Sequence, residues 1–360
     1  MPPLPTPATT PAVVAPSGPP PVRSATAQPA AAAPAPWPYH RVRLHIVTGK
    51  GGTGKTTVAG ALALALASGG RRVLVMEVEG RQGLAQLFDT PPLPYEERRV
   101  AASADGGEVF ALAVDAEGAL LEYLDLFYKL GRAGRVLDKM GAIDFATTVA
   151  PGLRDVLLTG KAYEAIRHHR GGRRTYDAVV LDAPPTGRIT RFLNVNSEVA
   201  GLARVGPVRT QADSIMSMLH SAETAVHLVT LLEEMPVQET VDGIADLTAV
   251  GLPVGAVLVN MLRGSPLRAT ELTAAAKGRL DPDKVAAGLA AAGLPSGTKI
   301  VSALLAEGVD LAERAALERR ERRAIAALAR PTYELQWLAD GVHLGGLYEL
   351  AAQLRAAGVR

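Results

Sequence analysis

The feature that most constrains this chain is the string GKGGTGKTT at residues 49–57. It fits the pattern G-x-x-x-x-G-K-[ST], in which glycines let successive backbone N–H groups point at one anion. An apolar run over 42–47 precedes the string, and a run rich in Ala and Leu over 58–67 follows it. These runs predict a strand and a helix, and strand–loop–helix is the context in which this pattern is a phosphate-binding loop.

The residues of the same string are expected to bind a nucleotide. We expect Lys55 to contact the β- and γ-phosphates and the Thr56 hydroxyl to ligate Mg²⁺. The N-terminus of the following helix adds a partial positive charge. The sequence therefore predicts a site for ATP or ADP with Mg²⁺, and the expected binding residues in the loop are Gly49, Lys50, Gly51, Gly52, Thr53, Gly54, Lys55, Thr56 and Thr57.

The rest of the chain alternates apolar runs with helical patterns, which predicts an α/β fold with a doubly wound, mostly parallel sheet. We expect helical insertions over about 115–172 and 196–223, and His168-His169-Arg170 to end a helix. Residues 88–107, which hold three prolines and a charged cluster, are expected to form a loop. Further strands are expected over 73–78, 109–114, 176–181, 225–231, 253–259 and 333–338.

Acidic residues follow two of these expected strands. Asp182 ends the strand over 176–181. In phosphate-loop proteins, an acid at the end of such a strand holds Mg²⁺ through water. Glu77 and Glu79 close the strand over 73–78, where side chains face the ligand crevice of a parallel sheet. Gly187 follows Asp182 closely enough for its N–H to meet the γ-phosphate.

Composition divides the chain in two and excludes several chemistries. Residues 1–38 hold 13 of the 26 prolines, so we expect a disordered Pro/Ala-rich tail before a domain over 39–360.

The chain has no cysteine, which excludes disulfides, thiolate metal sites and iron–sulfur ligation. A net charge of +2 gives no reason to expect a nucleic-acid partner. We find no signal peptide and no integral membrane segment, and we expect a cytoplasmic protein.

Two strings resemble a known family. Lys50 is a second lysine in the loop, and GKGGTGKTT resembles the deviant phosphate loop of the MinD, ParA and ArsA/GET-type ATPases. DAPPTGRITRFL at 182–193 resembles the second-switch string D-T-A-P-T-G-H-T-L-R-x-L of the ArsA/GET-type ATPases. The chain is thus similar to the ArsA/GET-type ATPases, P-loop enzymes related to MinD and ParA, in a cysteine-free, actinobacterial-looking branch.

The resemblance implies roles for particular residues. Lys50 would reach the nucleotide of a second subunit and act in catalysis with Lys55, and Glu79 would orient the attacking water where the family has Asp. Asn260 would hydrogen-bond the adenine. Apart from the resemblance, residues 337–339, which begin with Trp337, could line the base. The implied activity is Mg²⁺-dependent ATP hydrolysis in a homodimer, or in a heterodimer with a related ATPase. Its cycle would drive the binding and release of a protein client or a membrane-protein partner.

Departures from the family leave alternatives open. Arsenite sensing and the GET-type zinc clasp both use cysteines, so we expect neither zinc nor an iron–sulfur cluster. Glu79 is one methylene longer than Asp, and a nucleotide-loaded scaffold with little hydrolysis is a second hypothesis. A small-molecule kinase of the same loop class is a third. The apolar residues over 196–223 are either core or part of a client-binding groove.

Overall fold

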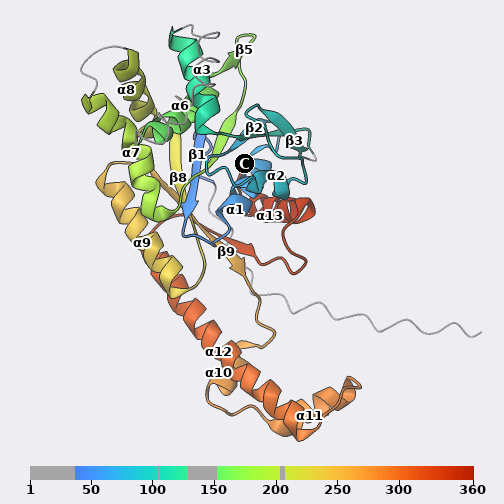
Figure 1. The fold of residues 1–360 in the computed structure, drawn as a ribbon. Helices are drawn as coiled ribbons and strands as arrows, with labels where there is room; N and C mark the ends of the chain where they lie inside the picture. The colour runs from blue at the N-terminus through green and yellow to red at the C-terminus, as the bar shows by residue number, and fades with distance from the viewer. Residues whose placement is uncertain (1–36, 104, 129–151, 203–206) are drawn as a thin grey trace, which may run out of the picture. The chain divides into compact units, whose positions relative to one another are not determined.

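The computed structural model describes residues 37–103, 105–128, 152–202 and 207–360 (Figure 1). Its main sheet has eight strands in the order β10-β9-β8-β1-β7-β2-β4-β3. Every neighbouring pair is parallel except β3 and β4. The predicted α/β fold with a mostly parallel sheet is therefore confirmed. The strands are β1 Leu44–Gly49, β2 Arg72–Glu77, β3 Arg98–Ala102, β4 Glu108–Ala113, β7 Ala178–Asp182, β8 Thr224–Thr230, β9 Val254–Leu262 and β10 Thr332–Gln336.

Helices cover both faces of this sheet. The side chains of β2 illustrate how one strand packs against helices on both faces. Val73 and Val75 pack in the core cluster that holds α1 (Lys55–Leu66) and α13 (Leu344–Ala356). Leu74 and Met76 pack in the cluster on the opposite face. Successive side chains of a strand point to opposite faces, so an unbroken apolar run suits a doubly covered strand. The helices of the second face are α3 Ala116–Tyr128, α6 Leu153–Arg167, α7 Thr186–Leu202 and α8 Pro207–Leu219.

The helices between β9 and β10 extend away from these two layers (Figure 1). The helix before them, over 234–249, still packs on the second face through Leu247. α9 (Glu234–Ala249) follows β8, and the 30-residue α12 (Thr298–Ala327) joins α9 and β9 through a small core that contains Ile325. α10 (Ala269–Ala276) packs on α12, and α11 (Pro282–Ala291) has no buried residue. The short α2 (Gly83–Leu87) follows β2. Among the described residues, no helix is both long and apolar enough to cross a membrane.

Three local expectations were wrong. Part of 88–107, expected as a loop, forms the edge strand β3, whose arginines hide the alternation that a half-buried strand usually shows. The helix expected to end with His168–Arg170 ends at Arg167, and a hairpin of β5 (His169–Arg170) and β6 (Arg173–Arg174) follows it. Gly171 and Gly172 both have positive φ there, as a tight hairpin turn requires. The helix expected from 196 begins ten residues earlier, at Thr186.

The N-terminal boundary also needs correction. The expected tail ends at residue 38, yet Trp37 is only 5% exposed. Its ring lies within 6.1 Å of the rings of His45, His227, Tyr39 and Tyr333. The compact unit that contains these residues begins at Ala35. Trp37 therefore belongs to the core of the domain and not to the tail.

A candidate nucleotide-binding site

The loop over 49–54 joins the central strand β1 to α1, and its glycines are required by close contacts. A Cβ on Gly49 would lie 2.2 Å from the carbonyl oxygen of Val229, and Gly49 has φ +152°. A Cβ on Gly54 would lie 2.5 Å from Nδ2 of Asn260, and Gly54 has φ +82°. Because L-residues with a Cβ fit neither the space nor the backbone, the curled loop depends on glycine at both positions.

The remaining residues of the loop lie where an anion could meet them. Gly51 and Gly52 are exposed at the loop, and Lys55 and Thr57 are half-buried in the first turn of α1. Thr53 is buried, and its hydroxyl donates to the Lys50 carbonyl at 2.8 Å. Gly187 is exposed in the first turn of α7. The loop is thus supported from within, while Gly51, Gly52 and the start of α1 stay accessible.

Thr56 and Asp182 meet beneath the loop, as two parallel neighbouring strands would place them. β1 pairs with β7, with Val47 opposite Asp182. The Thr56 hydroxyl donates to Oδ2 of Asp182 at 2.6 Å, whereas Oδ1 is buried and has no hydrogen-bond partner. A hydroxyl beside a carboxylate with an unused oxygen is a set of hard donors that fits Mg²⁺. These two residues would hold the ion.

The electrostatics of Asp182 favour a bound cation. The pKa of this carboxyl is raised to about 7, mainly by burial, and the nearby Glu77 and Glu79 act in the same direction. The Thr56 hydroxyl and the Lys55 ammonium act in the opposite direction. Without a cation nearby, ionisation of the Asp182 carboxyl therefore costs free energy in the folded chain. A divalent ion beside it would stabilise the charged form.

The two glutamates after β2 have different surroundings. Glu77 is 2% exposed, and its Oε2 accepts the backbone N–H of Leu84 in α2 at 3.0 Å. Glu79 is partly accessible and lies 3.9 Å from both Arg81 and Arg188. Glu77 thus fixes α2 below the site. Glu79 is the acid that a water molecule could reach.

Lys50 makes a contact that the sequence analysis missed. Its Nζ lies 2.6 Å from Oε1 of Glu239 on α9, and both side chains are about one-third exposed. The other oxygen of Glu239 accepts a 3.2 Å hydrogen bond from the Thr186 hydroxyl at the start of α7. In the single chain, the second lysine is therefore held by α9. The string E-x-M-x-x-x-E over 233–239, which ends in Glu239, is the signal in the sequence that could have indicated this contact.

Asn260 lies beside the loop, at the end of a buried part of β9. Its Nδ2 donates to the Thr53 carbonyl at 2.9 Å, so it supports the loop from below. A cavity of about 470 Å³ adjoins it and is lined also by Met261, Arg263 and Trp337. The Arg263 guanidinium stacks 4.3 Å from the centroid of the Trp337 ring. This cavity has the size and the flat walls to hold a base next to the phosphate loop.

A glycine-bounded loop at a helix N-terminus, with a hydroxyl–carboxylate pair below it, defines a P-loop nucleoside triphosphatase on this sheet. Comparison with known proteins places the chain within that class. The family model of anion-transporting ATPases matches residues 42–221. "ATPase BagA" of Mycobacterium tuberculosis (strain ATCC 25618 / H37Rv) is 53% identical over 320 residues, which cover 89% of this chain and 94% of that protein. The chain belongs to the anion-transporting ATPase family and is an ATP-hydrolysing enzyme.

More distant relatives share a smaller part of the chain. "Putative arsenical pump-driving ATPase" of Chlorobaculum tepidum is 27% identical over 263 residues, or 61% of each chain. "ATPase GET3" of Podospora anserina is 26% identical over 189 residues, which are 51% of this chain and 52% of that protein. These similarities confirm the resemblance to ArsA/GET-type ATPases.

Proposed function

We propose that this chain is a Mg²⁺-dependent, cytoplasmic ATPase that works as a homodimer, or as a heterodimer with a related ATPase. Its nucleotide cycle drives the binding and release of a protein or membrane-associated partner. The contact between Lys50 and Glu239 carries this proposal. A phosphate loop needs one lysine for its own nucleotide, and Lys55 occupies that position. The side chain of Lys50 instead contacts Glu239 of α9, and it would leave this contact to reach a nucleotide in a second subunit.

Each residue then has a defined task. Lys55 neutralises the phosphates of its own subunit, and Glu79 orients the attacking water. Thr56 and Asp182 hold Mg²⁺, which supplies positive charge to the phosphate oxygens when bound. Catalysis rests on position and charge, because phosphoryl transfer asks for little covalent help from the protein. Asn260 and Trp337 contact the base.

Two observations support a cycle that acts on a partner. Thr186, the first residue of α7, donates to the same Glu239 that holds Lys50, so departure of Lys50 changes the contacts at the start of α7. One relative is named as driving an arsenical pump, which supports a membrane-associated partner for this chain. A small change at the nucleotide would reach the helical face through α7.

Hydrolysis and self-association measured together test this proposal. The specific ATPase rate should rise with protein concentration, and sedimentation velocity should show a dimer with Mg²⁺ and a non-hydrolysable ATP analogue but not with ADP. Chelating Mg²⁺ should abolish both effects. A specific rate that is independent of concentration, with monomers in every nucleotide state, would contradict the dimer.

A further inference from the structure

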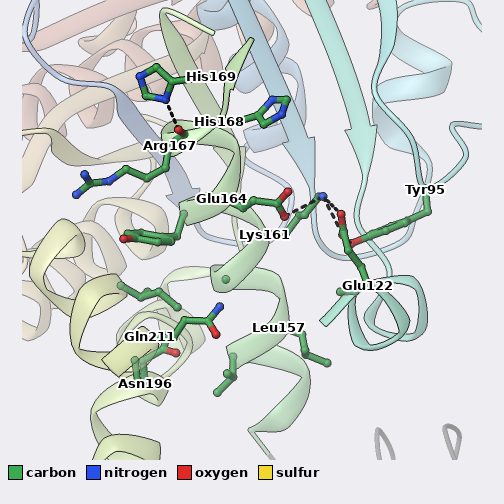
Figure 2. Close-up of a pocket in the computed structure, with 16 residues that line it drawn as sticks. Tyr95, Glu122, Leu157, Lys161, Glu164, Arg167, His168, His169, Asn196 and Gln211 are labelled. Atoms are coloured by element: carbon green, nitrogen blue, oxygen red, sulfur yellow. Dashed lines mark hydrogen bonds and ion pairs between the residues drawn. The ribbon is translucent and has the colours of Figure 1, made fainter. Parts of the chain in front are cut away.

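A second cavity, of about 460 Å³, lies among α3, α6, α7 and α8, on the helical face of the sheet (Figure 2). None of the residues that line it belongs to the nucleotide site. Its walls are mostly apolar, and Leu157, Tyr163 and Ile215 contribute much of that surface. Its volume is within the range of pockets that enclose small molecules.

Asn196 supplies a buried acceptor on the wall of this cavity. It is fully buried, and its Nδ2 donates to the Thr159 hydroxyl oxygen at 2.8 Å. Thr159 gives its only proton to a backbone carbonyl, that of Asp155 at 2.7 Å, and can therefore only accept from Asn196. This fixes the orientation of the amide. Oδ1 of Asn196 remains buried without a partner.

Gln211 repeats the feature on the neighbouring helix α8. Its Oε1 is also buried and has no hydrogen-bond partner, and Gln211 lines the same cavity as Asn196 (Figure 2). A buried polar atom left without a partner costs about 1–3 kcal/mol. Two such acceptors on one cavity indicate a ligand that brings O–H or N–H donors to them.

The ionisable side chains at the other end of the cavity contact one another. Lys161 is only 13% exposed, and its Nζ contacts Glu122 at 2.7 and 2.8 Å and Glu164 at 3.1 Å. An ammonium has three N–H donors, so these contacts leave none for a ligand. Tyr95 donates its hydroxyl to the same Glu122 at 2.6 Å. Arg167 lines the same end, with its guanidinium 5.5 Å from the centroid of the Tyr163 ring, so two cations balance the two carboxylates.

We propose that the cavity binds an uncharged amphiphile whose apolar chain lies against Leu157 and Ile215 and whose head donates hydrogen bonds to Asn196 and Gln211. The inference is independent of the proposed dimeric cycle, since it uses no residue of the nucleotide site. A Lys55→Ala chain, which should lose ATP binding, should keep this ligand site.

Calorimetric titration of the full-length chain with 1-octanol, methyl octyl ether and octanoate tests the chemistry. 1-Octanol should bind at one saturable site. The ether, which shares the apolar chain but donates no hydrogen bond, should bind about 3- to 10-fold more weakly, as loss of one neutral hydrogen bond predicts. Octanoate should bind more weakly than 1-octanol, because a carboxylate donates no hydrogen bond to the two acceptors. Gln211→Met keeps the length of the side chain and removes one of the two acceptors, so it should weaken the binding of 1-octanol and leave that of the ether unchanged.

A glycine in α6 offers a blocking variant that should fold. A Cβ on Gly160 would come no closer than 3.9 Å to Gln211 or Ile215, so Gly160→Leu should extend into the cavity. It should abolish 1-octanol binding. Its thermal midpoint is compared with that of Gly160→Ala, because the leucine side chain has to fit beside Gln211 and Ile215. Gly288→Leu, on the exposed α11, is the matched control and should bind normally. No saturable 1-octanol binding, equal affinity for alcohol and ether, or full binding by Gly160→Leu would each overturn the proposal.

Discussion

At the scale of single residues, Asp182 connects the nucleotide site to the stability of the chain. Its folded-state pKa of about 7 is above the ordinary 3.8, so between these values the folded state binds a proton that the unfolded state has released. Stability must then fall as pH rises through this window, by up to about 4 kcal/mol in total at about 1.4 kcal/mol per pH unit.

Asp182→Asn removes this penalty. Urea denaturation without nucleotide or Mg²⁺ should find the variant more stable than the wild type at pH 8, and the difference should shrink at pH 5. The variant should also lose Mg²⁺-dependent hydrolysis. Asp310→Asn, at an exposed position of α12, is the control and should show no such trend. A variant that is less stable than the wild type at pH 8 would mean that the carboxylate is not destabilised in the folded chain.

Glu239 offers a second test at this scale. Its contact with Lys50 is partly exposed, and such pairs contribute about 0.2–1 kcal/mol. Glu239→Gln should free Lys50 and lower the protein concentration needed for half-maximal ATPase rate, by up to about fivefold. Glu234 lies on the same helix and contacts Arg320 at 3.7 Å, so Glu234→Gln serves as the control. If Glu239→Gln instead abolishes hydrolysis, Glu239 is part of the working site.

At the scale of elements, the sequence predicted what local patterns determine. The strand–loop–helix around 49–57 follows from glycine spacing and apolar runs, and the pairing of Thr56 with Asp182 follows from two strands that end at one edge. β3 was missed because an edge strand bears charged side chains and pairs on one side only. The hairpin after α6 was missed, although Gly171-Gly172 was a visible turn signal.

Trp37 shows how a local reading can misplace an element. It lies in proline-rich sequence, but its ring stacks 5.6 Å from His227, and His227 contacts His45 at 3.0 Å. Both histidines are buried, and burial lowers the pKa of His45 to about 3. The pair is thus neutral in the folded chain. It forms a flat apolar surface for the indole.

Two truncations distinguish the tail from this packed segment. Deleting residues 1–34 should leave the thermal midpoint unchanged, since their Pro/Ala composition gives them little to bury. Deleting 1–38, or Trp37→Ala, should destabilise the chain by about 3–5 kcal/mol, as loss of a buried Trp does. Trp37→Phe should cost much less, because the indole N–H is buried without a partner. Equal midpoints for the two truncations would show that Trp37 is not packed in solution.

At the scale of the whole molecule, the site joins segments that are remote in sequence. Lys50 and Glu239 are 189 residues apart, and Thr53 and Asn260 are 207 apart. Such contacts depend on how β8, α9 and β9 are placed beside β1, which no local pattern of hydrophobicity specifies. The phosphate loop and the acidic residues near it could therefore be predicted from the sequence. The contact between Glu239 and Lys50 could not.

The central claim, that Lys50 acts on the nucleotide of a second subunit, is tested most directly by mixing two inactive variants. A Lys50→Ala subunit keeps Lys55, and a Lys55→Ala subunit keeps Lys50. Their heterodimer contains one complete site, with Lys55 from the first subunit and Lys50 from the second. We expect partial recovery of ATPase activity on mixing, up to about half of the wild-type rate per dimer if the sites act independently. Absence of recovery, while native mass spectrometry shows heterodimers, would contradict it and place Lys50 within its own subunit.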